Sequence, residues 1–296
     1  FIALLDHDDE LAVDAIDTIR AVAAAVGDEL DYAYSDEELL DETGRRVDIF
    51  EKPAWSPSRM RSQMYCGHLC VIRRSLANEV GGFDPAFDGS QDYDLVLRVA
   101  ERARRIVHIP NVLYRWRATE GSAALDPDGK PWAYAAGIRA VQAHCDRMGI
   151  EATVEPSEIV GVHHLRRRLA AKPLVSIIVP TAGSEGTVFG LPSLMVERCL
   201  DSIFDKSTYE NFEIVCVVDS GWRGSTSPDE LIDRYEGKPV RFFTDHGSFN
   251  FSRKINFGAF QAQGSRLVFL NDDTEVISPG WLEAMLGLLE EGNVGV

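Results

Sequence analysis

Apolar runs separated by amphipathic segments make up residues 173–296. Four continuous apolar runs predict buried strands, at residues 174–179, 213–218, 241–244 and 267–270. Helical spacing predicts helices between them, at residues 196–204 and 252–263. Buried strands that alternate with helices predict a doubly wound, mainly parallel α/β sheet covered on both faces. Ligands of such sheets bind beyond the carboxyl ends of the strands, where Thr181, Asp219 and residues 271–273 stand.

The first part of the chain follows a less regular pattern. Residues 28–120 predict short strands, loops and one helix at 93–105, with apolar positions at Leu95, Leu97, Val99 and Ala103. Residues 121–172 predict a connector, because 127–131 is rich in turn residues and 132–148 is helical.

The two ends of the chain contain related strings. Residues 5–11 read Leu-Asp-His-Asp-Asp-Glu-Leu, and residues 270–276 read Leu-Asn-Asp-Asp-Thr-Glu-Val, at a constant offset of 265. Each string follows an apolar run, at 1–5 or 267–270, and precedes a helical pattern, at 12–26 or 280–290. The repeat predicts one plan in both places: a buried strand, an acidic loop and an amphipathic helix.

Composition and charge narrow the class of protein. The chain has 30 Lys and Arg residues against 47 Asp and Glu, a formal net charge of −17, and 45% apolar residues. This ordinary globular composition excludes a disordered, collagen-like or disulfide-dense chain. Since phosphate neutralisation needs clustered Lys and Arg, the charge argues against a nucleic-acid polymer as partner. A small phosphate ligand bridged by a metal ion stays compatible with it.

The cysteines and the lack of long apolar runs indicate the cellular compartment of the protein. Five scattered cysteines predict buried free thiols in a reducing cytoplasm: Cys66, Cys70, Cys145, Cys199 and Cys216. The alternative is a metal half-site at Cys66 and Cys70, but no second Cys or His pair has matching spacing. No apolar run reaches the roughly 18 residues that cross a bilayer. The chain begins with Phe1 rather than Met, which predicts a window cut from a longer protein.

The acidic loops are candidate metal sites. Asp6, Asp8 and Asp9 repel one another unless a cation joins them, and hard divalent cations prefer oxygen ligands. The alternative is a solvated turn that serves as the acidic cap of the next helix. The second copy, with Asp272 and Asp273 at an equivalent strand end, favours a metal ion and a diphosphate.

Further candidates stand in the loops. Asp219 is placed to accept hydrogen bonds from a ribose or base, or simply to initiate a turn. Arg253 and Lys254 follow Ser252, a predicted helix cap, and two cations in a first turn indicate an anionic ligand or an ordinary surface pair.

The first part of the chain offers a base and an aromatic wall. Asp92 and Asp94 stand near a helix start and are candidate capping residues; alternatively, Asp92 is a carboxylate that takes a proton from an attacking hydroxyl. The aromatic segment 114–117, which contains Tyr114, Trp116 and Arg117, predicts a wall against a sugar or diphosphate, with core packing of Trp116 as the alternative. His68 either touches the ligand or is a hydrogen-bonded core histidine.

Together these motifs resemble family 2 glycosyltransferases of the GT-A fold, and in particular multi-domain bacterial enzymes of O-antigen and surface polysaccharide synthesis. The matching strings are 175–181, 217–219, 249–256 and 269–276 in the second part, and 4–11, 34–37, 52–57, 81–83, 89–95 and 113–117 in the first.

The resemblance implies roles for these residues. Thr181 and Asp219 would hold the nucleoside of a nucleotide-sugar, with Arg253, Lys254 and Asn256 near the same donor. His68, Trp116 and Arg117 would contact substrate. Asp6 with Asp8, and Asp272 with Asp273, would bind a divalent metal, Mg or Mn, that neutralises the departing diphosphate. Asp92 would be the general base of a single displacement, which inverts the anomeric configuration.

The order of the parts departs from the family. Residues 1–120 resemble the acceptor half that carries the base, and residues 173–296 resemble the donor half that normally precedes it. A fragment from the end of one transferase domain to the start of the next is predicted, joined by the connector 121–172. Pairing of the two halves as one circularly permuted unit is the alternative. Asn271 replaces the equivalent of Asp6, which leaves the second metal site one carboxylate fewer.

The predicted activity is transfer of a sugar from a nucleotide-diphosphate sugar to a glycan or lipid-linked glycan acceptor in cell-surface polysaccharide synthesis. The expected location is the cytoplasm, with peripheral association of the parent protein at the inner face of the membrane. A sugar-phosphate nucleotidyltransferase is an alternative, although residues 181–186 lack the cation of a phosphate loop. A catalytically silent carbohydrate-binding module is another.

Overall fold

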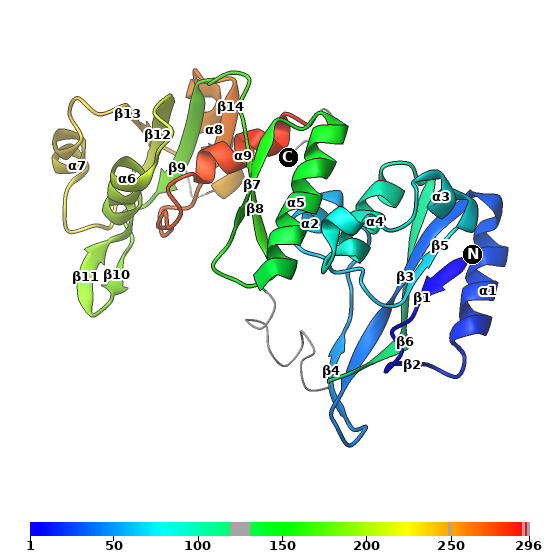
Figure 1. Cartoon of the computed structure of the whole chain (residues 1–296). Helices are drawn as coiled ribbons and strands as arrows, with labels where there is room; N and C mark the ends of the chain where they lie inside the picture. Colours follow the sequence, from blue (N-terminus) through cyan, green and yellow to red (C-terminus); the bar gives the residue numbers. More distant parts are fainter. Residues whose placement is uncertain (119–130, 248–249, 292–293, 295–296) are drawn as a thin grey trace. The chain divides into compact units, whose positions relative to one another are not determined.

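The computed structural model describes residues 1–118, 131–247, 250–291 and 294. Residues 121–130 of the predicted connector and Phe249 of the motif 249–256 lie outside this description. The chain divides into two compact units, Phe1–Arg168 and Leu169–Val296 (Figure 1). Within the described residues, no helix is both long enough and apolar enough to cross a membrane.

Unit 1 has a mixed six-stranded sheet in the order β1-β5-β3-β6-β2, with β4 paired to β3. Only the pairing of β3 with β6 is parallel, so the mainly parallel pattern does not extend to this unit. Its strands are β1 (Ile2–Leu4), β2 (Glu10–Leu11), β3 (Leu30–Leu40), β4 (Arg46–Phe50), β5 (Cys70–Ile72), β6 (Arg105–Arg117), β7 (Ala152–Pro156) and β8 (His163–Arg167), the last two forming a separate hairpin.

The helices of unit 1 cover both faces of this sheet. They are α1 (Ala15–Val26), α2 (Pro57–Ser62), α3 (Arg74–Glu79), α4 (Gln91–Ala100) and α5 (Pro131–Met148), with short 3-10 turns at Gly27–Glu29 and Pro85–Phe87. One apolar core joins α4 and α5 to β3 and β5, and another joins α1 to β3, β5 and β6. The predicted helix at 93–105 therefore ends earlier, at Ala100, because Arg105 begins β6.

Residues 131–168, within the predicted connector, fold onto unit 1. Buried Ala140, Val141 and Cys145 of α5 and Val154 of β7 belong to the same core as α4. These residues thus complete the first unit.

Unit 2 has a four-stranded, wholly parallel sheet in the order β13-β12-β9-β14. Its strands are β9 (Val175–Thr181), β12 (Phe212–Asp219), β13 (Val240–Asp245) and β14 (Arg266–Phe269), with a hairpin of β10 (Glu185–Val188) and β11 (Leu191–Leu194). Its helices are α6 (Met195–Lys206), α7 (Pro228–Arg234), α8 (Phe251–Gln261) and α9 (Trp281–Leu289). The four parallel strands and the helices α6 and α8 match the prediction for residues 173–296, but β13 and β14 are less buried than predicted. The β10–β11 hairpin and α7 are not predicted.

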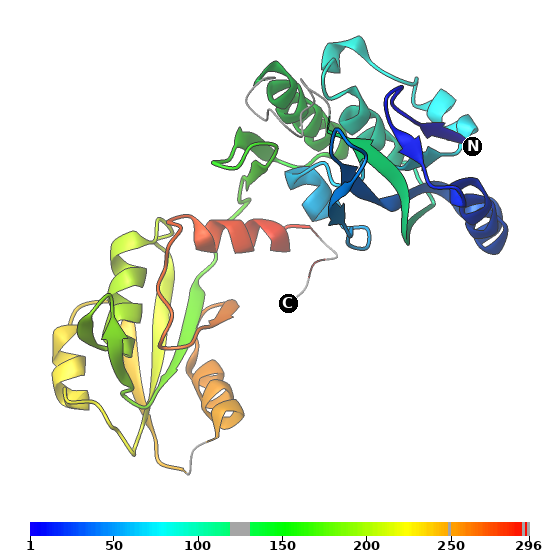
Figure 2. The same ribbon diagram turned by 90° about the horizontal axis from the view of Figure 1, so that it is seen from below.

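The sheet of unit 2 is covered on both faces. Apolar residues of α6 and α9 pack on one face, and Ile255 and Phe257 of α8 pack on the other (Figure 2). Gly258 permits the close approach of α8, because a Cβ there would lie 2.5 Å from Cγ2 of Ile178. Each unit has its own sheet.

The repeat predicts the elements correctly but not the burial of its strands. Strand, acidic loop and helix recur as β1 with α1 and as β14 with α9. However, neither strand is fully buried: Ala3, Leu267 and Phe269 are exposed. The reason is that β1 and β14 are both edge strands. The five cysteines are buried and free, as predicted.

Candidate active site

Polar residues of unit 2 gather where its parallel strands end. Register pairs Thr181 with Val218 across β9 and β12, and Asp219 with Asp245 across β12 and β13. Asp272 follows β14, which is parallel to β9. Because the carboxyl ends of parallel strands share one edge, Thr181, Asp219 and Asp272 lie along the same rim, as the sequence predicts.

Lys254 ties two of these strand ends together. It comes from α8 and is only 1% exposed. Its Nζ donates to Oδ2 of Asp219 at 2.9 Å and to the carbonyl oxygen of Thr181 at 3.2 Å. The ammonium group therefore compensates the Asp219 carboxylate and fixes its orientation.

The hydroxyl of Thr181 connects the same rim to the acidic loop. Its Oγ1 donates to Oδ2 of Asp272 at 2.6 Å and accepts from the backbone N–H of Gly183 at 3.1 Å. Burial raises the pKa of Asp272, and the neighbouring Asp273 carboxylate raises it further despite the hydrogen bond from Thr181. A cation at this loop would relieve the repulsion between the two carboxylates.

The other predicted donor residues, Arg253 and Asn256, belong to the same helix as Lys254. The guanidinium of Arg253 donates to Oδ2 of Asp245 at 2.8 Å. Asn256 is exposed on α8. The prediction that Ser252 caps the helix is wrong. Asn250 caps α8, because its side-chain oxygen accepts a hydrogen bond from the N–H of Arg253 at 2.9 Å.

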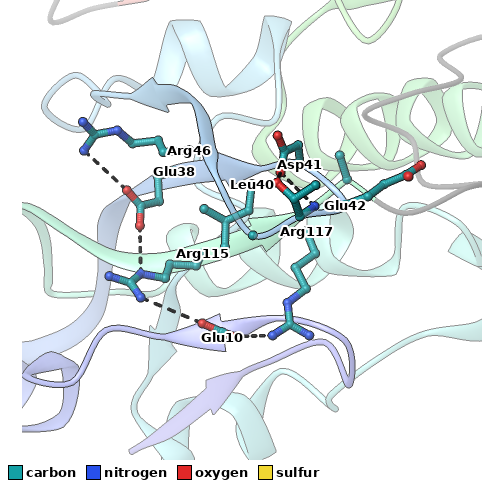
Figure 3. Close-up of a pocket in the computed structure, with 11 residues that line it drawn as sticks. Glu10, Glu38, Leu40, Asp41, Glu42, Arg46, Arg115 and Arg117 are labelled. Atoms are coloured by element: carbon teal, nitrogen blue, oxygen red, sulfur yellow. Dashed lines mark hydrogen bonds and ion pairs between the residues drawn. The ribbon is translucent and has the colours of Figure 1, made fainter.

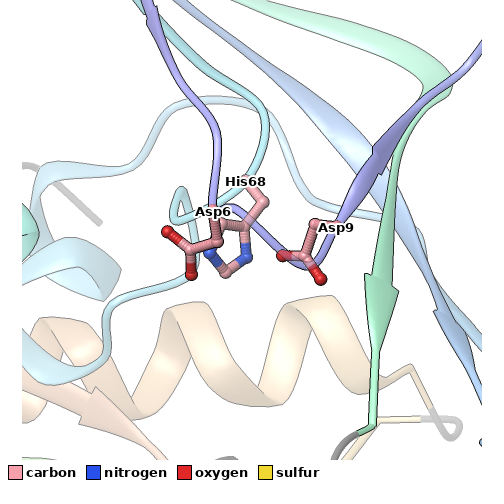
Figure 4. A group of neighbouring side chains, drawn as sticks. All are labelled: Asp6, Asp9 and His68. Carbon is pink, nitrogen blue, oxygen red and sulfur yellow. The ribbon is translucent and has the colours of Figure 1, made fainter.

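Unit 1 brings Asp6, Asp9 and His68 together (Figure 4). One ligand atom from each lies within 4.8 Å of the other two. Asp9 is also held by the protein, since Oδ2 accepts from the Tyr114 hydroxyl at 2.5 Å and Oδ1 from the N–H of Arg117 at 2.9 Å. Asp8, predicted as a ligand with Asp6, lies outside this group and pairs with His7 at 3.7 Å.

His68 is fixed from two sides. Its Nδ1 lies 3.3 Å from Oε2 of Glu37, and its ring stacks on Tyr114 with 4.6 Å between centroids. The Trp116 ring lies 5.6 Å from the ring of His68, and Trp116 also packs against the core beneath α1, as the alternative of core packing predicts. Burial lowers the pKa of His68, but the hydrogen bond and charge of Glu37 outweigh it, and the net shift is upward.

A buried lysine supports this histidine from behind. Lys52 Nζ contacts Oε2 of Glu37 at 3.0 Å and donates to the carbonyl oxygen of His68. Burial raises the pKa of Glu37, yet His68 and Lys52 together lower it below its ordinary value. The Glu37 carboxylate therefore stays charged and orients the imidazole.

Asp92 lies in the first turn of α4, near the same cluster. Burial raises its pKa, the charge of Asp6 raises it further, and His68 partly offsets the shift. A carboxylate with a raised pKa beside a polar cluster is suited to accept a proton. Asp94 is different, because it is fully buried and its Oδ2 accepts from Arg98 Nε at 2.9 Å.

The other face of the same strands carries a separate cavity of about 770 Å³ (Figure 3). Side chains alternate along β6, so Arg115 and Arg117 point away from Tyr114 and Trp116. Arg115 lies 2.8 Å from Glu38 and 3.9 Å from Glu10, which also pairs with Arg117. The guanidinium of Arg117, a predicted substrate ligand, thus belongs to this group of ion pairs.

Sequence reasoning assigned no role to Glu37 or Lys52. The signals were present but weak: acidic residues within a strand, and a lone lysine before Pro53. Their function depends on contacts between residues that lie far apart in the sequence.

The donor atoms suit a divalent cation. Two carboxylates and an imidazole in unit 1, or the two carboxylates of Asp272 and Asp273 in unit 2, are ligand types that Mn²⁺ accepts, and Mg²⁺ prefers the oxygens.

Residues 176–296 match the family model described as glycosyl transferase family 2. Unit 2 therefore carries a segment of this family, and the predicted resemblance and GT-A type α/β fold are confirmed.

Two curated relatives align with the whole chain. It is 38% identical over 302 residues to the uncharacterized protein y4gI of Sinorhizobium fredii (strain NBRC 101917 / NGR234), covering 100% of this chain and 32% of that protein. It is 34% identical over 297 residues to the O-antigen biosynthesis protein RfbC of Myxococcus xanthus, covering 100% of this chain and 22% of that protein. The chain thus spans a third or less of the length of these relatives.

Solved structures of TarS from S. aureus are more distant. One matches with 20% identity and a TM-score of 0.32, covering 40% of this chain and 32% of that chain. A second, in complex with UDP-GlcNAc, matches with 21% identity and a TM-score of 0.32, covering 40% of this chain and 31% of that chain.

Proposed function

We propose that the chain takes part in inverting, metal-dependent transfer of a sugar from a nucleotide-diphosphate sugar to a glycan or lipid-linked glycan acceptor. The observation that carries the proposal is the convergence of Thr181, Asp219 and Asp272 on one rim of the family 2 unit. The likeness to an O-antigen biosynthesis protein supports a place in cell-surface polysaccharide synthesis.

Unit 2 supplies the donor side. Asp219, held by Lys254, accepts hydrogen bonds from the nucleoside, and Thr181 orients Asp272. Asp272 and Asp273 hold the divalent ion, for which the raised pKa of Asp272 is a physical reason. A bound Mg or Mn ion supplies Lewis-acid stabilisation of the diphosphate as it departs.

Unit 1 supplies the acceptor side. The Asp92 carboxylate takes the proton of the acceptor hydroxyl, whose oxygen bonds to the anomeric carbon while the bond to the diphosphate breaks. Attack opposite the leaving group inverts the configuration. The pKa of Asp92 is raised toward neutral pH, which makes its carboxylate a stronger base. Trp116 and His68 line the place where a saccharide stacks.

Calorimetric titration of the chain with UDP, GDP and TDP, with and without Mn²⁺, tests this proposal. We expect one of them to bind in a Mn²⁺-dependent manner, and Asp219→Asn to weaken that binding at least about tenfold, or about 1.4 kcal/mol. The matched control Asp233→Asn, an exposed position in α7, leaves binding unchanged. Metal-independent binding that Asp219→Asn does not alter would overturn the proposal.

A further inference from the structure

The β10–β11 hairpin of unit 2 has an exposed apolar tip. Val188 pairs with Leu191, so only Phe189 and Gly190 form the loop between the strands. Phe189 is 91% exposed and Leu191 is 65% exposed, and Figure 1 shows the hairpin projecting from the body of unit 2. Residues 186–196 contain no charged side chain. The tip therefore presents an uncharged apolar surface to its surroundings.

The backbone of Phe189 adopts a conformation that bulky residues avoid. Its φ is 51°, and the φ of Gly190 is 81°. Two positive φ values in a two-residue hairpin loop favour Asn-Gly, and a bulky side chain at the first position is an outlier. Among the described residues, Phe189 is the only one other than glycine with a positive φ. An asparagine would suit the turn better, which indicates that the exposed ring is there to bind something.

The base of the hairpin is attached to the rim of the parallel sheet. The backbone N–H of Met195 donates to the carbonyl oxygen of Ser184 at 3.0 Å and closes the hairpin. Oε1 of Glu185 accepts from the backbone N–H of Ser225 at 2.6 Å. These bonds join the loop after Thr181 to the loop after Asp219. The tip is thus held in a fixed relation to the proposed donor residues.

The size of the tip indicates what binds it. A stable protein interface takes about 20–30 residues from each partner, whereas the exposed apolar residues of this tip are Phe189, Leu191 and Pro192. Insertion into a membrane interface needs only apolar side chains that leave water, so a small tip is sufficient for weak, reversible binding.

Charge indicates which kind of membrane surface fits. The guanidinium of Arg198 lies 6.0 Å from the Phe189 ring, but it pairs with Glu275 at 2.7 Å and is therefore neutralised. The whole chain has a net charge of −17, which repels anionic lipids. Zwitterionic headgroups are the surface that these charges favour.

We propose that the tip of the β10–β11 hairpin inserts into the interfacial region of a bilayer with zwitterionic headgroups. One consequence rests on the proposed function, in which the acceptor is lipid-linked. The hairpin would hold the rim of Thr181 and Asp219 at the surface from which such an acceptor projects.

Flotation of the full chain with phosphatidylcholine vesicles tests the proposal. Phe189→Asn should lower the partition coefficient at least about tenfold, because the ring supplies much of the inserted apolar area. The same variant should keep or raise Tm, since asparagine is favoured at this turn position, so lost binding is not lost folding. The matched control Phe260→Asn removes a ring that is 86% exposed on α8 and should leave partition unchanged.

Brominated phosphatidylcholine reports whether the tip enters the lipid. Vesicles of this lipid should quench the fluorescence of Phe189→Trp more strongly than that of the parent chain or of Phe260→Trp. Equal quenching of the two tryptophan variants, equal flotation of Phe189→Asn and the parent chain, or flotation that requires phosphatidylglycerol would overturn the proposal. So would a parent chain that does not float.

Light scattering without lipid examines a protein occupant. A dimer of the parent chain that Phe189→Asn dissociates would overturn the proposal, because the tip would then bind a second copy. A monomer in both cases supports it. None of these measurements uses a nucleotide or a metal ion, so their failure is distinct from failure of the proposed function.

Discussion

Replacing Lys254 by Met removes the ammonium group that joins two strand ends in unit 2. Nζ lies 2.9 Å from Oδ2 of Asp219, and the two side chains are 2% and 12% exposed. Breaking a buried ion pair leaves an uncompensated charge and costs about 3–5 kcal/mol. We therefore expect Lys254→Met to lower the free energy of unfolding of unit 2 by about that amount.

The chain offers a matched control at nearly the same distance. Lys206 Nζ lies 2.8 Å from Oε1 of Glu275, but these side chains are 40% and 37% exposed. Solvent screens such a pair, so Lys206→Met should cost about 0–1 kcal/mol. The two variants separate the effect of burial from the effect of distance.

Hydrogen–deuterium exchange is the suitable assay, because unfolding of a chain with two units is not one transition. Amides in the centre of β12 exchange only when unit 2 unfolds, so their protection factors report the free energy of unfolding of unit 2. Asp219→Asn added to Lys254→Met should recover part of the loss, since the neutral amide needs no ammonium partner. Equal effects of Lys254→Met and Lys206→Met, or no recovery by Asp219→Asn, would refute the reasoning.

Three further predictions concern single positions. Burial raises the folded-state pKa of Asp92 above its ordinary value, so the contribution of this residue to folding is lost as the pH rises through the raised pKa. Asp92→Asn should therefore raise Tm at pH 7 but not at pH 3. A lower Tm at pH 7 would contradict this. Asp94→Ala removes a fully buried partner of a guanidinium and should cost about 3–5 kcal/mol in exchange of α4 amides, whereas Glu79→Ala, at an exposed pair, should cost under about 1 kcal/mol. Gly258→Ala places a Cβ 2.5 Å from Ile178 and should cost about 1–3 kcal/mol, so an unchanged Tm would show that α8 yields freely.

The fold of unit 2 could be predicted because its central strands can be recognised from their own sequences. Parallel strands that are buried on both faces read as continuous apolar runs, and β9 and β12 do so from Val175 and Ile214 onward. The residues at the ends of such strands share one rim, so the sequence alone predicts that Thr181 and Asp219 lie together.

The long strand β3 of unit 1 could not be predicted in the same way. It contains buried Asp31, Asp36 and Glu38, which are unfavourable in an apolar strand. Each is compensated by a residue distant in sequence. Arg104 lies 2.7 Å from Asp31, His108 lies 2.7 Å from Asp36, and Arg115 lies 2.8 Å from Glu38. Such pairs become visible only after the sheet has formed.

The same limit applies to the site. Charge and spacing identified Lys254 as a candidate ligand, but its burial beneath the rim is a tertiary property. Likewise, the sequence Asp6-His7-Asp8-Asp9 does not reveal which carboxylate turns toward His68. The hydroxyl of Tyr114 decides this, because it binds Asp9 from β6.

Anomalous diffraction from crystals of the chain grown with Mn²⁺ and a bound nucleoside diphosphate tests the central claim most directly. The account predicts a manganese peak at the Asp272 and Asp273 loop, with the nucleoside against Thr181 and Asp219 and the diphosphate on the metal. A nucleotide bound elsewhere in unit 2, or bound at this rim with no manganese beside the carboxylates, would contradict it.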